Sequence, residues 1–177
     1  MGEREARPHL EAGEEHLRRQ EWTQAEEAFR RGTAAHPESP VAWSKLGVTL
    51  AHQRRFGEAI AALREGISVN PRYAPAYSNL GNVYREQGRK EDALAAYRQA
   101  IEADPDYWIA HQNLGALYRE MGRVTDAVGE FKRASRLSAR SGAPRRFGCF
   151  GPAASVFALL LLLLGAGLPA LARLLRP

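Results

Sequence analysis

The stretch YSNLGNVYREQGR at residues 77–89 returns as HQNLGALYREMGR at residues 111–123. Both copies contain Asn-Leu-Gly, then Tyr-Arg-Glu, and close on Gly-Arg. The copies start 34 residues apart, and the same interval relates other positions along most of the chain. A fixed period of this length predicts a repeat protein, in which each copy supplies a packing surface for the next.

Most of the residues that recur at this interval are apolar or small. The aligned sets are Trp43, Tyr77, His111; Leu46, Leu80, Leu114; Gly47, Gly81, Gly115; Leu50, Tyr84, Tyr118; Ala59, Ala93, Ala127; Leu63, Tyr97, Phe131; and Pro71, Pro105. One period earlier the pattern continues more weakly through Gly13, Ala25, Phe29 and Pro37. Apolar residues one helical turn apart predict helices, and the prolines predict where helices end. Gly88 and Gly122 fall where a tight turn would join two helices.

This pattern resembles the tetratricopeptide repeat over residues 6–141. We divide that range into four units, 6–39, 40–73, 74–107 and 108–141, of which the first is degenerate in its opening helix. The resemblance implies an all-α solenoid of helical hairpins wound as a right-handed superhelix. It also implies that the first helix of each unit lines a concave groove, where such proteins bind peptides or partner helices.

The resemblance places the residue before each Leu-Gly pair in that groove. We therefore predict a partner-binding groove that contains Lys45, Asn79, Asn82 and Asn113. An amide offers a donor and an acceptor together, which suits a peptide backbone of any sequence. The alternative is that Asn-Leu-Gly serves only the stability of the repeat. A clamp for a C-terminal carboxylate is not expected, because no lysine occupies its position in any unit.

The last part of the chain is strongly apolar. Residues 147–172 contain no charged side chain, and residues 159–164 are all leucine. About 20 apolar residues suffice to span a bilayer as a helix. We predict a transmembrane helix at 152–172, after a basic linker at 142–151 and before a short tail at 173–177. A soluble helix that caps the solenoid is the alternative, but such a helix normally has a polar stripe.

The net charge of +5 is unevenly distributed. Residues 132–177 hold eight basic and no acidic residues, whereas residues 1–131 hold 17 basic and 20 acidic ones. The positive-inside rule then predicts cytoplasmic repeats, with Arg145 and Arg146 near anionic lipid headgroups. The excess of 22 Arg over 3 Lys favours a bacterial inner membrane over a eukaryotic organelle. Nucleic acid is not an expected partner, because no basic face with stacking aromatics is evident.

The sequence does not favour catalysis. It carries no nucleophile-elbow, phosphate-loop, dinucleotide or zinc-protease motif, and Cys149 is its single cysteine. Cys149 is expected to be a plain thiol, with acylation as the alternative. We predict no cofactor and no metal site. The expected function is that of a membrane-anchored adaptor that binds a partner protein at the cytoplasmic membrane face. The alternative is a structural subunit whose repeats self-associate as a homo-oligomer or pack within a membrane complex.

Overall fold

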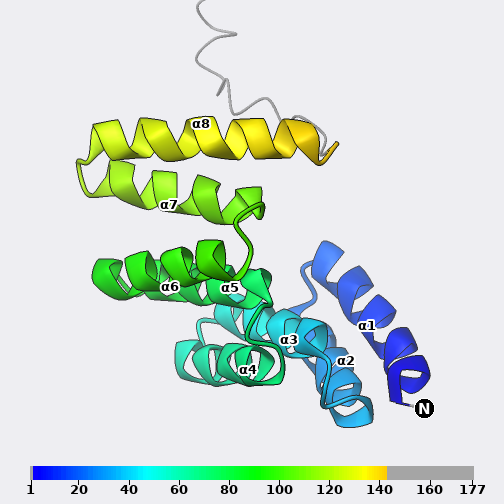
Figure 1. Cartoon of the computed structure of the whole chain (residues 1–177). Helices are drawn as coiled ribbons and strands as arrows, with labels where there is room; N and C mark the ends of the chain where they lie inside the picture. The colour runs from blue at the N-terminus through cyan, green and yellow to red at the C-terminus, as the bar shows by residue number, and fades with distance from the viewer. Residues whose placement is uncertain (1, 143–177) are drawn as a thin grey trace, which may run out of the picture. The chain divides into compact units, whose positions relative to one another are not determined.

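The computed structural model describes residues 2–142, which form eight α-helices and no strand (Figure 1). The helices are α1 (Gly2–Arg18), α2 (Trp22–Ala35), α3 (Pro40–His52), α4 (Phe56–Val69), α5 (Ala74–Glu86), α6 (Lys90–Ala103), α7 (Trp108–Glu120) and α8 (Val124–Arg140). They pair as four hairpins, α1–α2, α3–α4, α5–α6 and α7–α8, and each hairpin contacts the next. The prediction of an all-α stack of helical hairpins is confirmed.

Each hairpin is closed by a glycine of its first helix against a large side chain of its second. A Cβ atom built on Gly81 would lie 2.5 Å from Cε1 of Tyr97, well inside van der Waals contact. The corresponding pairs are Gly13 with Phe29 at 2.5 Å, Gly47 with Leu63 at 2.6 Å and Gly115 with Phe131 at 2.9 Å. Only glycine leaves room for this approach, which explains why the sequence repeats it.

The turn inside each hairpin contains one residue in the left-handed region. Gly88 and Gly122 have φ values of 75° and 77°, as the sequence predicts for these turns. The first two hairpins place Gln20 and Arg54 at the same point, with φ values of 60° and 63°. Because side chains are disfavoured in this region, sequence alone did not reveal that all four turns share one conformation.

The turns between hairpins follow the prolines. Helices α2, α4 and α6 end two residues before Pro37, Pro71 and Pro105. The fourth hairpin has Ala139 where the next proline would fall, and α8 continues through it to Arg140. Helix α8 therefore has 17 residues, against 14 in α6.

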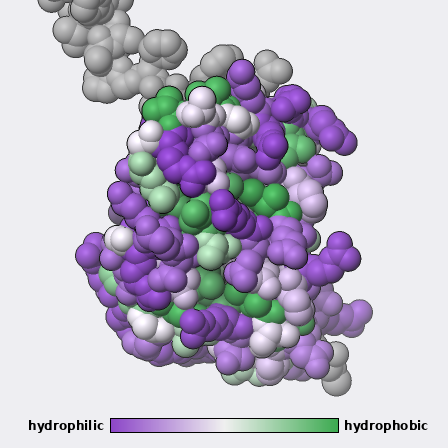
Figure 2. Space-filling view, turned by 60° about the vertical axis from the view of Figure 1, so that its left-hand side comes forward, coloured by the Kyte–Doolittle hydropathy of each residue, from purple (hydrophilic) through white to green (hydrophobic). Residues whose placement is uncertain are grey.

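The core runs through all four hairpins and thins at α8. Phe29, Leu63 and Tyr97 are 0% exposed, whereas Phe131 at the matching position of α8 is only partly buried. Val124 and Val128 on the same helix are 65% and 46% exposed. Within residues 2–142 the last helix therefore leaves an apolar strip uncovered. The face drawn in Figure 2 is largely hydrophilic and carries separate hydrophobic patches.

The predicted membrane localisation, with cytoplasmic repeats, is wrong on the evidence of the described helices. None of the helices between residues 2 and 142 is long and apolar enough to cross a membrane. The physical reason is that the longest have 17 residues and carry charged side chains, whereas a span needs about 20 apolar residues. The predicted span at 152–172, the tail at 173–177, Arg145, Arg146 and Cys149 lie outside the described residues. The predicted linker at 142–151 does too, apart from Gly142.

Candidate partner-binding surfaces

Two of the predicted groove residues make the same contact in successive hairpins. Asn79 Nδ2 on α5 donates to Ser44 Oγ on α3 at 3.0 Å, and Asn113 Nδ2 on α7 donates to Ser78 Oγ on α5 at 3.0 Å. Both serines are buried, and both asparagines are half-buried. Each amide nitrogen therefore fastens one hairpin to the preceding hairpin. We call this contact the Asn–Ser clasp.

The clasp leaves the other end of each amide available. Among the described residues, neither Asn79 Oδ1 nor Asn113 Oδ1 has a hydrogen-bond partner. No fully buried side-chain oxygen or nitrogen in that part of the chain lacks a partner. Both Oδ1 atoms are therefore reached by solvent. Since the clasp fixes which way each amide points, these two positions present acceptors to solvent.

Asn82 has the opposite polarity. Its Oδ1 accepts a hydrogen bond of 2.7 Å from the Tyr97 hydroxyl. Burial raises the pKa of Tyr97 to about 12, so the hydroxyl stays protonated and can donate. The amide nitrogen of Asn82 has no acceptor within residues 2–142, and the side chain is half-buried. Asn82 therefore presents a donor on the same face of α5 as Asn79, three residues away.

Lys45 lies on α3 at the position that Asn79 and Asn113 occupy on α5 and α7. Its ammonium group lies 2.9 Å from a carboxylate oxygen of Glu14 on α1, and both side chains are substantially exposed. Helices α3, α5 and α7 contact one another in that order. The four predicted residues thus lie along a surface made by first helices, with Asn79 and Asn82 adjacent and Lys45 at the end nearest the N-terminus.

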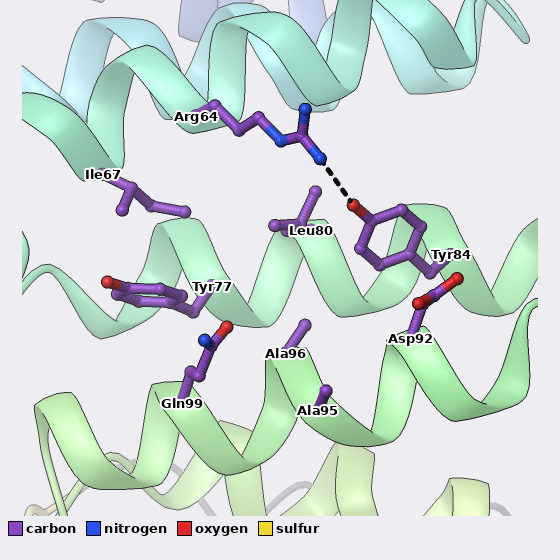
Figure 3. A pocket seen from close by; sticks show the side chains of 9 residues that line it. All are labelled: Arg64, Ile67, Tyr77, Leu80, Tyr84, Asp92, Ala95, Ala96 and Gln99. Carbon is purple, nitrogen blue, oxygen red and sulfur yellow. Dashed lines mark hydrogen bonds between the residues drawn. The ribbon is translucent and has the colours of Figure 1, made fainter.

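A hollow of about 390 Å³ lies on the other side of α5, between α4 and α6 (Figure 3). Tyr77, Leu80 and Tyr84 of α5 form its floor, because they occupy the helix face opposite Asn79 and Asn82. The other lining residues are Arg64 and Ile67 of α4 and Asp92, Ala95, Ala96 and Gln99 of α6. Arg64 donates a long hydrogen bond of 3.4 Å to the Tyr84 hydroxyl. Sequence reasoning assigned these α5 residues to packing and missed the hollow.

Sequence reasoning also missed a contact between a histidine of α7 and a glutamate of α8. His111, predicted as a packing residue, is buried, but its Nδ1 lies 2.6 Å from Glu130 Oε2. Its Nε2 lies 3.2 Å from the carbonyl oxygen of Pro105. The signal was a histidine where the second and third hairpins have Trp43 and Tyr77. No three potential metal ligands cluster within residues 2–142.

These hairpins define a helical repeat protein, and the comparisons identify the family. Models of the tetratricopeptide repeat match residues 10–75, 62–95 and 81–122, and together they span 10–122. The chain belongs to the tetratricopeptide repeat family. No curated protein matches the sequence.

Several solved structures share the fold. A crystal structure of MamA is similar at 27% identity, with a TM-score of 0.64, over 78% of this chain and 81% of that one. PilF of Pseudomonas aeruginosa gives 23% identity and a TM-score of 0.70, over 78% and 63% of the two chains. The first tetratricopeptide domain of Spaghetti (RPAP3), bound to the HSP90 peptide SRMEEVD, gives 20% identity and a TM-score of 0.60, over 67% and 94%. The last two show the fold alone.

Proposed function

We propose that this protein is a non-catalytic adaptor whose first-helix surface binds an extended segment of a partner protein. The observation that carries the proposal is the polarity of three amides. Asn79 and Asn113 offer acceptors, and Asn82 offers a donor. An extended peptide backbone presents N–H and C=O groups in alternation, so it can satisfy both kinds of amide whatever its side chains are.

Preorganisation favours this use of the amides. The bonds to Ser44, Ser78 and Tyr97 hold each amide in one orientation before any ligand arrives. Binding then loses less side-chain entropy than it would with freely rotating amides. The Spaghetti domain, which shares the fold and is bound to a peptide of HSP90, supports a peptide as the ligand.

Lys45 adds a charge at one end of the proposed surface. Its ion pair with Glu14 is substantially exposed, and such pairs contribute only about 0–1 kcal/mol. A carboxylate of the partner could therefore replace Glu14 at little cost. We propose that Lys45 favours an acidic residue at that end of the bound segment.

A structural role is the second candidate. The Asn–Ser clasp joins successive hairpins, so Asn79 and Asn113 contribute to the scaffold whether or not a peptide binds. The exposed Val124 and Val128 offer an apolar surface through which copies of the chain could associate. This candidate predicts that loss of the asparagines affects stability and leaves partner capture unchanged.

Two double variants separate the candidates. Asn79→Ala/Asn113→Ala removes the clasp and the ligand-facing acceptors, whereas Ser44→Ala/Ser78→Ala removes only the clasp. Both pairs should lower the free energy of unfolding by about 1–3 kcal/mol, at 0.5–1.5 kcal/mol per hydrogen bond. The asparagine pair should also weaken capture of peptides selected by the wild-type chain, by roughly five- to 150-fold. The serine pair should weaken capture less, because it keeps the acceptors and loses only their fixed orientation.

The readouts are urea unfolding and fluorescence anisotropy with a selected, labelled peptide. Normal capture by the asparagine variant, together with its lower stability, would assign those residues to the scaffold alone. An equal loss of capture in both double variants would show that the clasp, and not the free acceptor, controls binding.

A further inference from the structure

A second hollow, of about 480 Å³, lies between α6 and the end of α8. Its lining residues are Ile101, Pro105, His111, Arg133, Arg136, Leu137 and Arg140. The three arginines come from α8, where Arg136 and Arg140 lie one helical turn apart. We call this hollow the α8 site. It is separate from the surface that carries Asn79 and Asn82.

The α8 site exists because the fourth hairpin departs from the repeat. Its last turn, which carries Leu137 and Arg140, is helical since Ala139 stands where the other hairpins have proline. The side chains of the α8 site also differ from those at the matching positions of the third hairpin. The α8-site residues Arg133, Arg136, Leu137 and Arg140 lie 34 residues after Gln99, Glu102, Ala103 and Asp106. Two acids of the third hairpin are thus replaced by two arginines.

The positive charge of the site is only partly balanced. Glu130 supplies one carboxylate, which is shared between His111 at 2.6 Å and Arg133 at 3.1 Å. Arg136 donates to the backbone carbonyl of Lys132 at 3.4 Å. Within residues 2–142, neither Arg136 nor Arg140 has a carboxylate within ion-pairing distance. Among the described residues, these two guanidinium groups therefore lack counter-charges.

Three of the lining residues are apolar. Ile101, Pro105 and Leu137 supply aliphatic surface, and Ile101 also packs against the core. His111 also lines the hollow. Both of its ring nitrogens are already in contact with Glu130 and the carbonyl oxygen of Pro105, so neither is available to a ligand. A complementary ligand must combine a negative charge with an apolar group. Guanidinium groups pair best with planar anions such as carboxylates, which they can bind through two hydrogen bonds.

We propose that the α8 site binds a peptide segment of a partner in which an Asp or Glu lies beside a large apolar side chain. The carboxylate contacts Arg136 and Arg140, and the apolar group rests on Ile101 and Leu137. A hollow of this size holds a side chain or two, which fits a peptide anchor better than a flat lipid surface. This proposal does not depend on the asparagine surface.

The test uses the full chain and a displayed library of random dodecapeptides. Selections are run on the wild type, on Arg136→Gln/Arg140→Gln, and on the matched control Arg4→Gln/Arg7→Gln. The control arginines are also exposed, and neither makes an ion pair within the described residues. We expect the wild type and the control to enrich peptides with an acid beside a large apolar residue. The α8-site variant should bind such a peptide at least about ten-fold more weakly, as loss of 1.4 kcal/mol or more requires.

Other outcomes overturn the proposal. Equal affinity of the α8-site variant and the control would exclude Arg136 and Arg140 as the anchor. Loss of the enriched peptides in Asn79→Ala/Asn113→Ala, with no loss in the α8-site variant, would assign all binding to the asparagine surface. Arginine-dependent binding to vesicles of phosphatidylserine and phosphatidylcholine, without any acidic peptide enriched, would replace the peptide with a lipid surface. Circular dichroism of each variant shows whether it is folded.

Discussion

At the scale of single residues, each hairpin depends on a contact between a glycine of its first helix and a large side chain of its second. Gly81 leaves room for the ring of Tyr97, and a glycine packed against a large side chain closes each of the other three hairpins in the same way. Not every glycine has this role. Gly129, in the middle of α8, would place a Cβ atom in open space, with nothing within 4 Å. The two glycines therefore respond to the same substitution in opposite ways.

We predict that Gly81→Ala destabilises the protein and Gly129→Ala stabilises it. The first substitution forces a methyl group against a fully buried ring, which costs about 1–3 kcal/mol. The second removes a flexible residue from a helix interior, which gains about 0.5–1 kcal/mol. Urea denaturation of both variants measures the two changes. A neutral Gly81→Ala would mean that Tyr97 can move aside, and the hairpin would then be more loosely packed than described.

At the scale of helices, one buried acid joins the first two hairpins. Glu26 on α2 is 7% exposed and lies 2.8 Å from Arg55, which precedes α4. It also accepts from Gln53 at 2.8 Å, and Arg30 lies 2.9 Å away. A buried carboxylate is costly without partners, and here three neighbours compensate it. The contact thus fixes how α2 meets the turn between α3 and α4.

We predict that Glu26 makes the protein sensitive to acid. Burial alone would raise the pKa of this carboxyl, but hydrogen bonds from Gln53 and Arg55, with the charges of Arg30 and Arg55, outweigh burial and lower it below its ordinary value of 4.5. A depressed pKa adds stability that is present above about pH 4.5 and is lost as the pH falls through the lower, folded-state pKa.

Glu26→Gln should therefore lower stability at pH 7, by about 1–3 kcal/mol, and flatten its decline below pH 4.5. Urea unfolding at a series of pH values measures both effects. Glu27→Gln is the matched control, because Glu27 is exposed and pairs only with Arg31. If the Glu26 variant loses stability in acid as steeply as the control, another group governs the acid response.

The helices themselves were largely predictable, whereas the contacts between them were not. The 34-residue period placed the helical hairpins. The clasp from Asn79 to Ser44 spans 35 residues, one more than the period, and recurs between Asn113 and Ser78. The 35-residue separation of each asparagine from its serine can be read from the sequence. That the two side chains form a hydrogen bond follows only from the way neighbouring hairpins pack. The Glu26 contact to Arg55 occurs once and leaves no periodic signal.

At the scale of the whole repeat array, stability is a sum of hairpins and of the interfaces between them. Hairpin α5–α6 has a neighbouring hairpin on each side. Within residues 2–142, hairpin α7–α8 has a neighbour on one side only, and Val124 and Val128 are exposed there. The same end carries the α8 site. The end of the described array that exposes an apolar strip is thus an end that also departs from the repeat.

This asymmetry predicts an order of hydrogen exchange. Backbone amides of α4 and α6, whose hairpins have a neighbour on each side, should exchange more slowly than those of α8, because local opening of α8 breaks one interface and exposes an end that is already half-covered. Exchange followed by mass spectrometry on the full chain measures the order. Leu80→Ala, which leaves a cavity worth about 2–5 kcal/mol in the central core, should lower protection in α5 and α6 and bring them closer to α8. Equal protection of α6 and α8 in the unmodified chain would contradict the gradient and mean that the strip at Val124 and Val128 is covered in solution.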